Sequence, residues 1–166
     1  MYNKYVKERE RKIRMTEKAI YFDMDGTIAN LYGVEGWLAD LRSYNERPYK
    51  EAAPMINMNV LAKRLNKLHS IGYKIGIVSW LSKASSVEYD KKVIKAKQKW
   101  LSAHLHSVQF DEIHIVSYGT RKEQIVEMPF GILFDDEKQN RENWYGKSFN
   151  EENILDILKQ IIDSEK

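Results

Sequence analysis

Two acidic segments far apart in the chain contain the residues best suited to chemistry. Segment 23–27 reads DMDGT, with carboxylates at Asp23 and Asp25, and Asp135 is followed directly by Asp136. If the fold gathers these groups, up to four negative charges repel one another, and some of them must take up a proton. A hard divalent cation removes this conflict, and carboxylate oxygens together with water are the ligands that Mg²⁺ prefers. Because the chain has no cysteine and no HxxxH spacing, a magnesium site is expected and a zinc site is not.

Short apolar runs precede these acidic residues and predict buried strands. Three runs end at a polar residue: 19–22 before Asp23, 73–78 before Ser79 and 131–134 before Asp135. In open parallel α/β sheets, ligands bind outside the carboxyl ends of the strands. We therefore expect the three polar residues to converge at one edge of the sheet, where they could act on a phosphate.

The rest of the chain alternates strands with amphipathic helices, which is typical of a parallel α/β sheet. Apolar residues recur every three or four positions from Met58 to Leu68, in a helix expected to begin near Pro54 and to end near Gly72. The other expected elements are a helix at about 86–106, a strand at about 112–117, a short helix near 121–127, a polar loop at 137–147 and a last helix at about 151–163, with Ser148 and Glu151 as its capping box. The predicted fold is a Rossmann-like three-layer α/β sandwich over residues 19–166, with a mainly parallel sheet.

Residues 19–27, an apolar run followed by DMDGT, resemble motif I of the haloacid dehalogenase (HAD) superfamily of phosphotransferases. Residues 75–79 (IGIVS) look like motif II of that superfamily, and residues 132–136 (ILFDD) look like the acidic pair of its motif IV. The resemblance covers about residues 19–147. It implies a HAD-type fold and a Mg²⁺-dependent phosphatase that forms an aspartyl-phosphate.

The resemblance also implies a role for each residue of the first two motifs. Asp23 would be the nucleophile that attacks phosphorus, and Asp25 would protonate the leaving alkoxide and later deprotonate water. Gly26 and Thr27 would shape the turn that holds the substrate. Ser79 would hydrogen-bond the oxygens of the phosphoryl group during transfer.

Two kinds of charge are expected around these groups. The resemblance implies that Mg²⁺ is held by Asp23, Asp135, Asp136 and the backbone carbonyl of Asp25. It also implies a motif III lysine that neutralises the nucleophile and the phosphate. Lys122 is the first candidate because it follows the strand expected at 112–117 and opens a short helix. Arg121 and Lys97 are the alternatives.

An irregular insertion at about 31–55 follows the first strand and has the place of a cap over the site. Its roughly 25 residues have room for one or two short helices only, so the expected cap is small and the expected site is open to larger phosphorylated substrates. Trp80 directly follows Ser79. It could stack on a ring of the substrate or pack against the next loop, and we expect it to bind substrate.

Two groups within the superfamily look similar to this chain. Residues 99–101, 110–113, 120–122 and 134–136 look like the second half of the 5′(3′)-deoxyribonucleotidase group, which favours a nucleoside monophosphate as substrate. The 3′-phosphatase domain of polynucleotide kinases also combines a DxDGT start with a DD ending, and it is the alternative. A second alternative is a HAD-fold binding module that has lost activity.

The composition restricts the remaining possibilities. The chain has 166 residues, a length that suits one domain. Its net charge is +3. Residues 1–18 contain seven Lys or Arg and three Glu. This basic N-terminal segment could bind nucleic acid, but a solvated helix is the favoured interpretation. We expect neither a secretory leader nor a membrane span from this sequence, and therefore no membrane partner and a cytoplasmic location. The four histidines are interpreted as structural or exposed residues.

Overall fold

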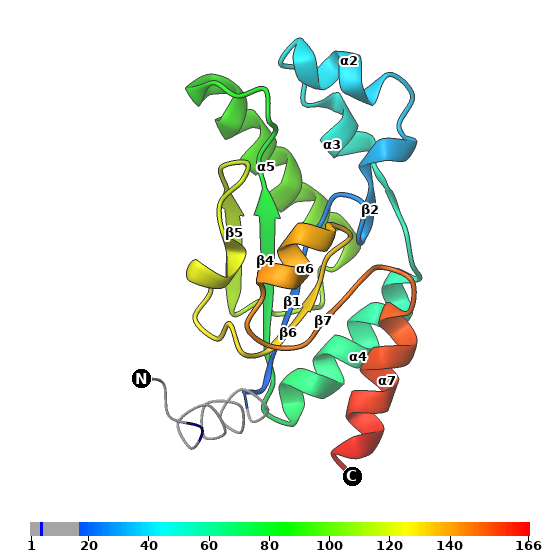
Figure 1. Ribbon diagram of the computed structural model, residues 1–166. Coiled ribbons are helices and arrows are strands. Elements are labelled where there is room, and N and C mark those ends of the chain that lie inside the picture. The colour runs from blue at the N-terminus through cyan, green and yellow to red at the C-terminus, as the bar shows by residue number, and fades with distance from the viewer. Residues whose placement is uncertain (1–3, 5–16) are drawn as a thin grey trace.

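The computed structural model describes Lys4 and residues 17–166, which fold around a five-stranded parallel sheet (Figure 1). The strands are β1 (Ala19–Phe22), β4 (Lys74–Trp80), β5 (Glu112–Val116), β6 (Ile132–Phe134) and β7 (Ser148–Phe149). Their order is β5-β4-β1-β6-β7, and each neighbouring pair is parallel. The prediction of an α/β fold with a mainly parallel sheet is confirmed.

The first strand, β1, occupies the centre of the sheet because its side chains are apolar toward both faces. All four of its residues are at most 1% exposed, as expected of a parallel strand that is covered on both sides. Ile20 and Phe22 point into one apolar cluster, whereas Ala19 and Tyr21 point into another on the opposite face. Its carboxyl end is therefore flanked by β4 on one side and by β6 on the other.

The two faces of the sheet are covered unequally. The long helices α4 (Met58–Ser70), α5 (Val87–His104) and α7 (Ile154–Ser164) contribute buried residues to the cluster of Ile20 and Phe22. The opposite face is covered by the short 3₁₀ helix η2 (Lys122–Gln124), helix α6 (Lys138–Asn143) and their flanking residues Val126 and Trp144. This thin second layer brings η2 and α6 close to the carboxyl end of β1.

Residues 31–55, here called the insertion, form a small helical lobe beside the sheet. It consists of the 3₁₀ helix η1 (Leu31–Gly33), α2 (Trp37–Arg42), α3 (Arg47–Glu51) and β3 (Ala53–Pro54), and β3 pairs antiparallel with β2 (Ala29–Asn30). Leu31, Leu41 and Tyr49 pack against Tyr89 and Val93 of α5. The insertion therefore rests on the start of α5, above the carboxyl ends of the strands (Figure 1).

Several element boundaries differ from those expected from the sequence. Helix α4 begins at Met58 rather than near Pro54, because the Asn57 side chain accepts a hydrogen bond from Val60 N (3.1 Å) and caps the helix. Strand β4 continues through Trp80 because β5 pairs with it up to that residue. The helix expected at 121–127 is the single turn η2.

The polar segment 137–147 was expected to be a loop, and this expectation is wrong. It contains α6, whose carboxyl end is fixed by the hydrogen bond from the Trp144 indole to Gly131 O (2.9 Å). The expected capping box is also wrong, because Ser148 belongs to β7 and α7 begins at Ile154 without a side-chain cap. Helix α6 and the two-residue strand β7 were not predicted, because neither has the apolar periodicity on which the prediction depended.

The expected basic N-terminal segment lies outside the described residues, apart from Lys4, Glu17 and Lys18. In the described part of the chain, every helix is too short or too polar to cross a bilayer.

Candidate active site

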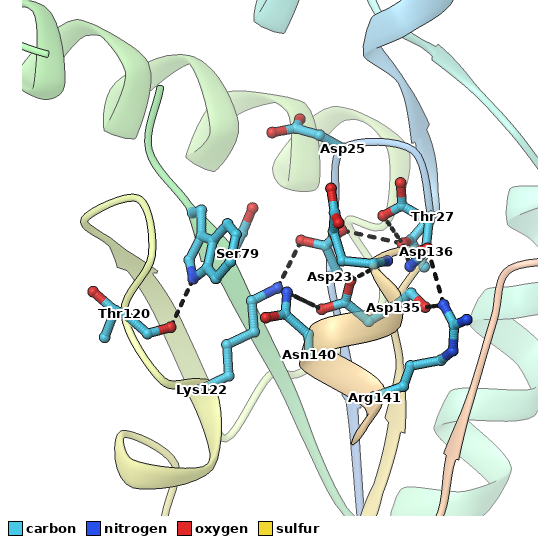
Figure 2. A network of polar contacts seen from close by, with 12 residues as sticks. Asp23, Asp25, Thr27, Ser79, Thr120, Lys122, Asp135, Asp136, Asn140 and Arg141 are labelled. Carbon is cyan, nitrogen blue, oxygen red and sulfur yellow. Dashed lines mark hydrogen bonds and ion pairs between the residues drawn. The ribbon is translucent and has the colours of Figure 1, made fainter. Parts of the chain in front are cut away.

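The carboxyl end of β1 places Asp23 between the two neighbouring strands. Its backbone N–H donates to Phe134 O of β6 (2.9 Å), so the sheet pairing continues one residue past β1. Asp135 leaves β6 at the same level, and its N–H donates to Phe149 O of β7 (3.0 Å). On the other side, the buried Ser79 lies near the end of β4. The structure thus brings the three polar strand-end residues to one edge of the sheet (Figure 2).

Lys122 connects the two carboxylates that leave β1 and β6. Its Nζ lies 3.0 Å from Asp23 Oδ1 and 2.7 Å from Asp135 Oδ2, and its side chain is 2% exposed. Burial by itself would lower the pKa of Lys122, but Asp23 and Asp135 outweigh this effect and the pKa is raised. The ammonium group is therefore held in its charged form beside Asp23, the expected nucleophile.

Lys97, on α5, makes a second buried ion pair. Its Nζ lies 2.8 Å from Asp25 Oδ2, 2.7 Å from Ser79 Oγ and 2.7 Å from Trp80 O. Burial raises the pKa of Asp25, Lys97 opposes this shift, and the charge of Asp23 adds to it. Both lysines considered for motif III thus enter the site, one beside each carboxylate of segment 23–27. The third candidate, Arg121, points outward and pairs with Glu123 (2.5 Å).

Three carboxylates gather where β1 and β6 end. Oxygens of Asp23, Asp135 and Asp136 all lie within 4.8 Å of one another. Glu137 N donates to Asp135 Oδ1 (2.9 Å) and Asn140 Nδ2 donates to Asp135 Oδ2 (3.1 Å), so this side chain is fixed from α6. The fourth carboxylate, Asp25, is paired with Lys97 instead. It lies outside the group of three (Figure 2).

The charges of this cluster favour a bound cation. Burial, and next the charge of Asp23, raise the pKa of Asp135 to about 6 and that of Asp136 to about 8. Each raised pKa means that the cluster takes up protons unless another positive charge is present. Because all the donors are carboxylate oxygens, the set fits Mg²⁺.

The expected turn residues hold the two acidic segments together. Thr27 Oγ1 donates toward Asp23 Oδ2 (3.1 Å) and Asp136 Oδ1 (3.2 Å), and it accepts from Asp136 N (3.1 Å). Gly26 has a φ of +78°, and a Cβ there would lie 2.4 Å from Asp136 Oδ2 and 2.8 Å from the ring of Tyr32. A larger residue at 26 would therefore push Asp136 out of the carboxylate group.

We expect Gly26→Ala to weaken Mg²⁺ binding by at least about 10-fold and to destabilise the protein by about 1–3 kcal/mol. The matched control is Gly119→Ala, because Gly119 has a similar φ of +87° and nothing lies within 4 Å of the added methyl group. Urea unfolding and Mg²⁺ titration of both variants separate the backbone cost from the steric one. Equal Mg²⁺ affinities in the two variants would contradict the proposed closeness of position 26 to the metal ligands.

A cavity of about 550 Å³ opens above these groups. Asp23, Asp25, Asp136 and Lys122 lie on its lining, and aromatic side chains from both the insertion and the sheet form walls: Tyr32, Trp37, Tyr49, Trp80 and Tyr118. The cavity therefore combines a charged floor with aromatic walls.

Trp80 packs against a loop and also faces the cavity, and its expected binding of substrate stays a prediction. Its indole N–H donates to Thr120 O (2.8 Å), and its ring lies 4.9 Å from that of Tyr118, so it packs against the loop after β5. The same side chain lines the cavity. It is thus fixed in place by the loop and available to a ligand.

Two supporting residues were missed by the sequence analysis because both lie on the unexpected helix α6. Asn140 contacts Asp135, and Arg141 Nη1 donates to the backbone carbonyls of Asp135 (3.0 Å) and Asp136 (2.9 Å). Asn140 and Arg141 follow Asp135 by five and six residues, and this spacing could have indicated their contact with it. A helix that starts just after a strand places its first turns close to the end of that strand.

The parallel α/β sheet of this chain is an architecture that solved structures of other proteins share. Solved structures with this fold include the D,D-heptose 1,7-bisphosphate phosphatase of Burkholderia thailandensis, at a TM-score of 0.55 and 10% identity over 88% of this chain and 99% of that one. The D,D-heptose 1,7-bisphosphate phosphatase of B. bronchiseptica, complexed with magnesium and phosphate, matches at a TM-score of 0.54 and 9% identity, over 89% of this chain and 99% of that one. No protein-family model and no curated protein sequence matches the chain.

We expect the stabilisation by Mg²⁺ to increase with pH. The pKa values of Asp135 and Asp136 are raised in the folded protein, so without metal their protonation stabilises the fold at low pH, and this stability is lost as the pH rises through about 6 and about 8. Mg²⁺ competes with these protons. At a concentration of 100 Kd it should add about 2.7 kcal/mol.

Thermal unfolding in EDTA and in a fixed concentration of Mg²⁺ tests this expectation. The increase in Tm on adding Mg²⁺ should be small near pH 5 and largest near pH 8. An increase that does not depend on pH would show that the metal does not displace these protons.

Proposed function

We propose that this chain is a Mg²⁺-dependent phosphomonoester hydrolase that forms an aspartyl-phosphate on Asp23. The observation that carries the proposal is the position of Asp23. Its carboxylate lies at the floor of the cavity, 3.0 Å from the buried ammonium of Lys122 and in reach of two further carboxylates. A carboxylate so placed can approach a phosphate ester because the surrounding positive charges offset the repulsion between the two anions.

In the first step, a carboxylate oxygen of Asp23 attacks phosphorus and the bond from phosphorus to the ester oxygen breaks. Asp25 transfers its proton to that oxygen, which leaves as an alcohol. The raised pKa of Asp25 supports this role, because burial favours the protonated form of the carboxyl group. Bound Mg²⁺ would be held by Asp23, Asp135, Asp136 and the backbone carbonyl of Asp25, and it would neutralise charge on the phosphoryl oxygens.

In the second step, the carboxylate of Asp25 accepts a proton from water while the water oxygen attacks phosphorus. The bond between phosphorus and Asp23 then breaks, which releases phosphate and restores the carboxylate. We expect Ser79, whose Oγ accepts a hydrogen bond from Lys97 Nζ (2.7 Å), to donate its hydroxyl proton to a phosphoryl oxygen. Lys122 stays beside Asp23 through both steps and stabilises it as the leaving group.

The substrate that we propose is a nucleoside monophosphate, and the insertion would act as a small cap over it. The aromatic walls of the cavity support this substrate, because a base could stack between rings of the insertion and rings of the sheet edge. Trp37 of α2 and Trp80 of β4 lie on the same cavity. The solved phosphatases with this fold are named for a small phosphorylated sugar, and such a substrate fits the charged floor equally well.

Phosphate release from a panel of esters tests the proposal. We expect turnover of p-nitrophenyl phosphate with Mg²⁺ and none with EDTA, and a higher kcat/KM for dUMP and dTMP than for a sugar phosphate. The panel includes a 3′-phosphorylated oligonucleotide, assayed with the full chain and with residues 1–18 deleted. Preference for the oligonucleotide that disappears with the deletion would favour an end-processing phosphatase instead. No release from any ester would favour a binding module.

A further inference from the structure

Two basic residues line the outer part of the cavity without serving the carboxylates at its floor. Arg42 is the last residue of α2, and Lys83 lies in the loop between β4 and α5; both line the cavity and both are exposed. The acidic groups on the floor already have cationic partners, since Lys122 pairs with Asp23 and Lys97 pairs with Asp25. Arg42 and Lys83 are thus not needed to neutralise the carboxylates at the floor of the cavity.

The neighbours of Arg42 are paired among themselves. In the insertion, Arg47 contacts Asp40 (2.5 Å) and Glu51 (2.6 Å), and Lys50 contacts Glu46 (3.0 Å). Within the described residues, the side chain of Arg42 makes no hydrogen bond and no ion pair. Its guanidinium group is therefore available to a ligand.

The surroundings of Lys83 follow the same pattern. The two nearest acidic residues along the chain have other partners. Glu88 pairs with Lys91 (3.8 Å), and both carboxylate oxygens of Asp90 lie 2.8 Å from Ser85 Oγ, which donates to them. Across residues 17–166, Lys83 likewise makes no hydrogen bond or ion pair. Both sides of the cavity opening thus present an unpaired cation.

The two cations belong to parts of the chain that are fixed to one another. The ring of Tyr44, two residues after Arg42, lies 5.3 Å from the ring of Tyr89 on α5. The buried Tyr89 also donates its hydroxyl to Asn45 O (3.0 Å). Arg42 and Lys83 therefore border the cavity from two walls that are held together, as a preformed site for one ligand requires.

We propose that Arg42 and Lys83 bind a second anionic group, of the phosphate type, on the leaving-group side of the substrate. This inference rests on the proposed function, because it takes the phosphoryl group that is cleaved to lie at Asp23. The cavity then has a floor that acts on one phosphate and an opening that holds another. Two sources share this chemistry: a small bisphosphate, and a phosphodiester next to a phosphorylated nucleic-acid end.

Binding to the Asp23→Asn variant in Mg²⁺ tests the inference without turnover. By calorimetry, 2′-deoxyuridine 3′,5′-bisphosphate should bind about 10-fold more tightly than dUMP, since two exposed ion pairs each contribute a few-fold. The added double substitution Arg42→Gln and Lys83→Gln should abolish this difference, and so should high salt. Lys63→Gln on α4, an exposed residue outside the cavity, is the matched control and should keep the difference.

The outcomes separate this inference from the proposed function. The inference is overturned if neither the bisphosphate nor a phosphorylated dinucleotide binds more tightly than dUMP, or if the preference survives the double substitution. A phosphorylated dinucleotide that gains affinity through the same two residues, when the bisphosphate does not, assigns the second anion to a nucleic-acid end. The unsubstituted protein is assayed in parallel for phosphate release from dUMP, and failure there would count against the proposed function alone.

Discussion

Replacing Asp23 with Asn is expected to lower kcat for p-nitrophenyl phosphate by about 10⁴-fold or more, as removal of a covalent nucleophile does in other enzymes. The amide is a far weaker nucleophile than the carboxylate and leaves no ready route to the aspartyl-phosphate. The fold should persist, because the amide has the shape of the carboxyl group and its substitution removes one of three charges that repel one another. Mg²⁺-dependent phosphate release measures the loss.

The control for this substitution is Asp156→Asn on α7, an exposed position remote from the cavity, which should leave kcat unchanged. Circular dichroism and thermal unfolding should show the same fold for both variants. In the unsubstituted protein, mass spectrometry of an acid-quenched reaction should find phosphate on the peptide that contains Asp23. Turnover by Asp23→Asn above a tenth of the original rate would rule out the covalent route.

Lys122→Met should destabilise the metal-free protein by about 3–5 kcal/mol, because it leaves Asp23 and Asp135 buried without their shared cation. Since Mg²⁺ can replace the missing charge, it should stabilise this variant more than the unsubstituted protein. The kcat should fall by about 10²–10⁴-fold, as for the loss of a group that stabilises charge in the transition state. Urea unfolding in EDTA and in Mg²⁺, together with phosphate release, provides the three measurements.

Lys138→Met is the matched control, because Lys138 is 81% exposed and its contact with Glu142 is a surface pair on α6. That change should cost less than about 1 kcal/mol and should not depend on Mg²⁺. If both variants lose the same stability, Lys122 contributes no more than a surface lysine. If Lys122→Met loses stability but keeps its kcat, the lysine supports the fold and takes no part in the reaction.

The sequence was sufficient for the features that follow from strand direction. Asp23, Ser79 and Asp135 could be placed at one edge because the carboxyl ends of parallel strands share an edge, whatever the intervening helices do. Lys122 could be placed near them only by its order after the strand that is β5. Lys122 and Asp23 are 99 residues apart in the sequence. At that separation, spacing alone does not predict that the two side chains are in contact.

The features that could not be predicted come from polar segments and from side-chain direction. Helix α6 has no apolar stripe, so its Asn140 and Arg141 did not stand out as supports of the acidic pair. Lys97 lies on a helix whose sequence has basic residues on several sides, and only the packing of α5 on the sheet shows that this one points inward. The side-chain directions of Asp25 and Asp136 likewise depend on partners far along the chain.

The central position of β1, between strands made later in the chain, has a consequence for protein synthesis. Asp23 leaves the ribosome early, whereas the strands that flank it and the residues that complete its surroundings follow one after another, ending with β7, whose Phe149 accepts the hydrogen bond from Asp135. Pairings between distant segments form late and slowly. The complete surroundings of Asp23 and Asp135 can therefore form only after translation has passed β7.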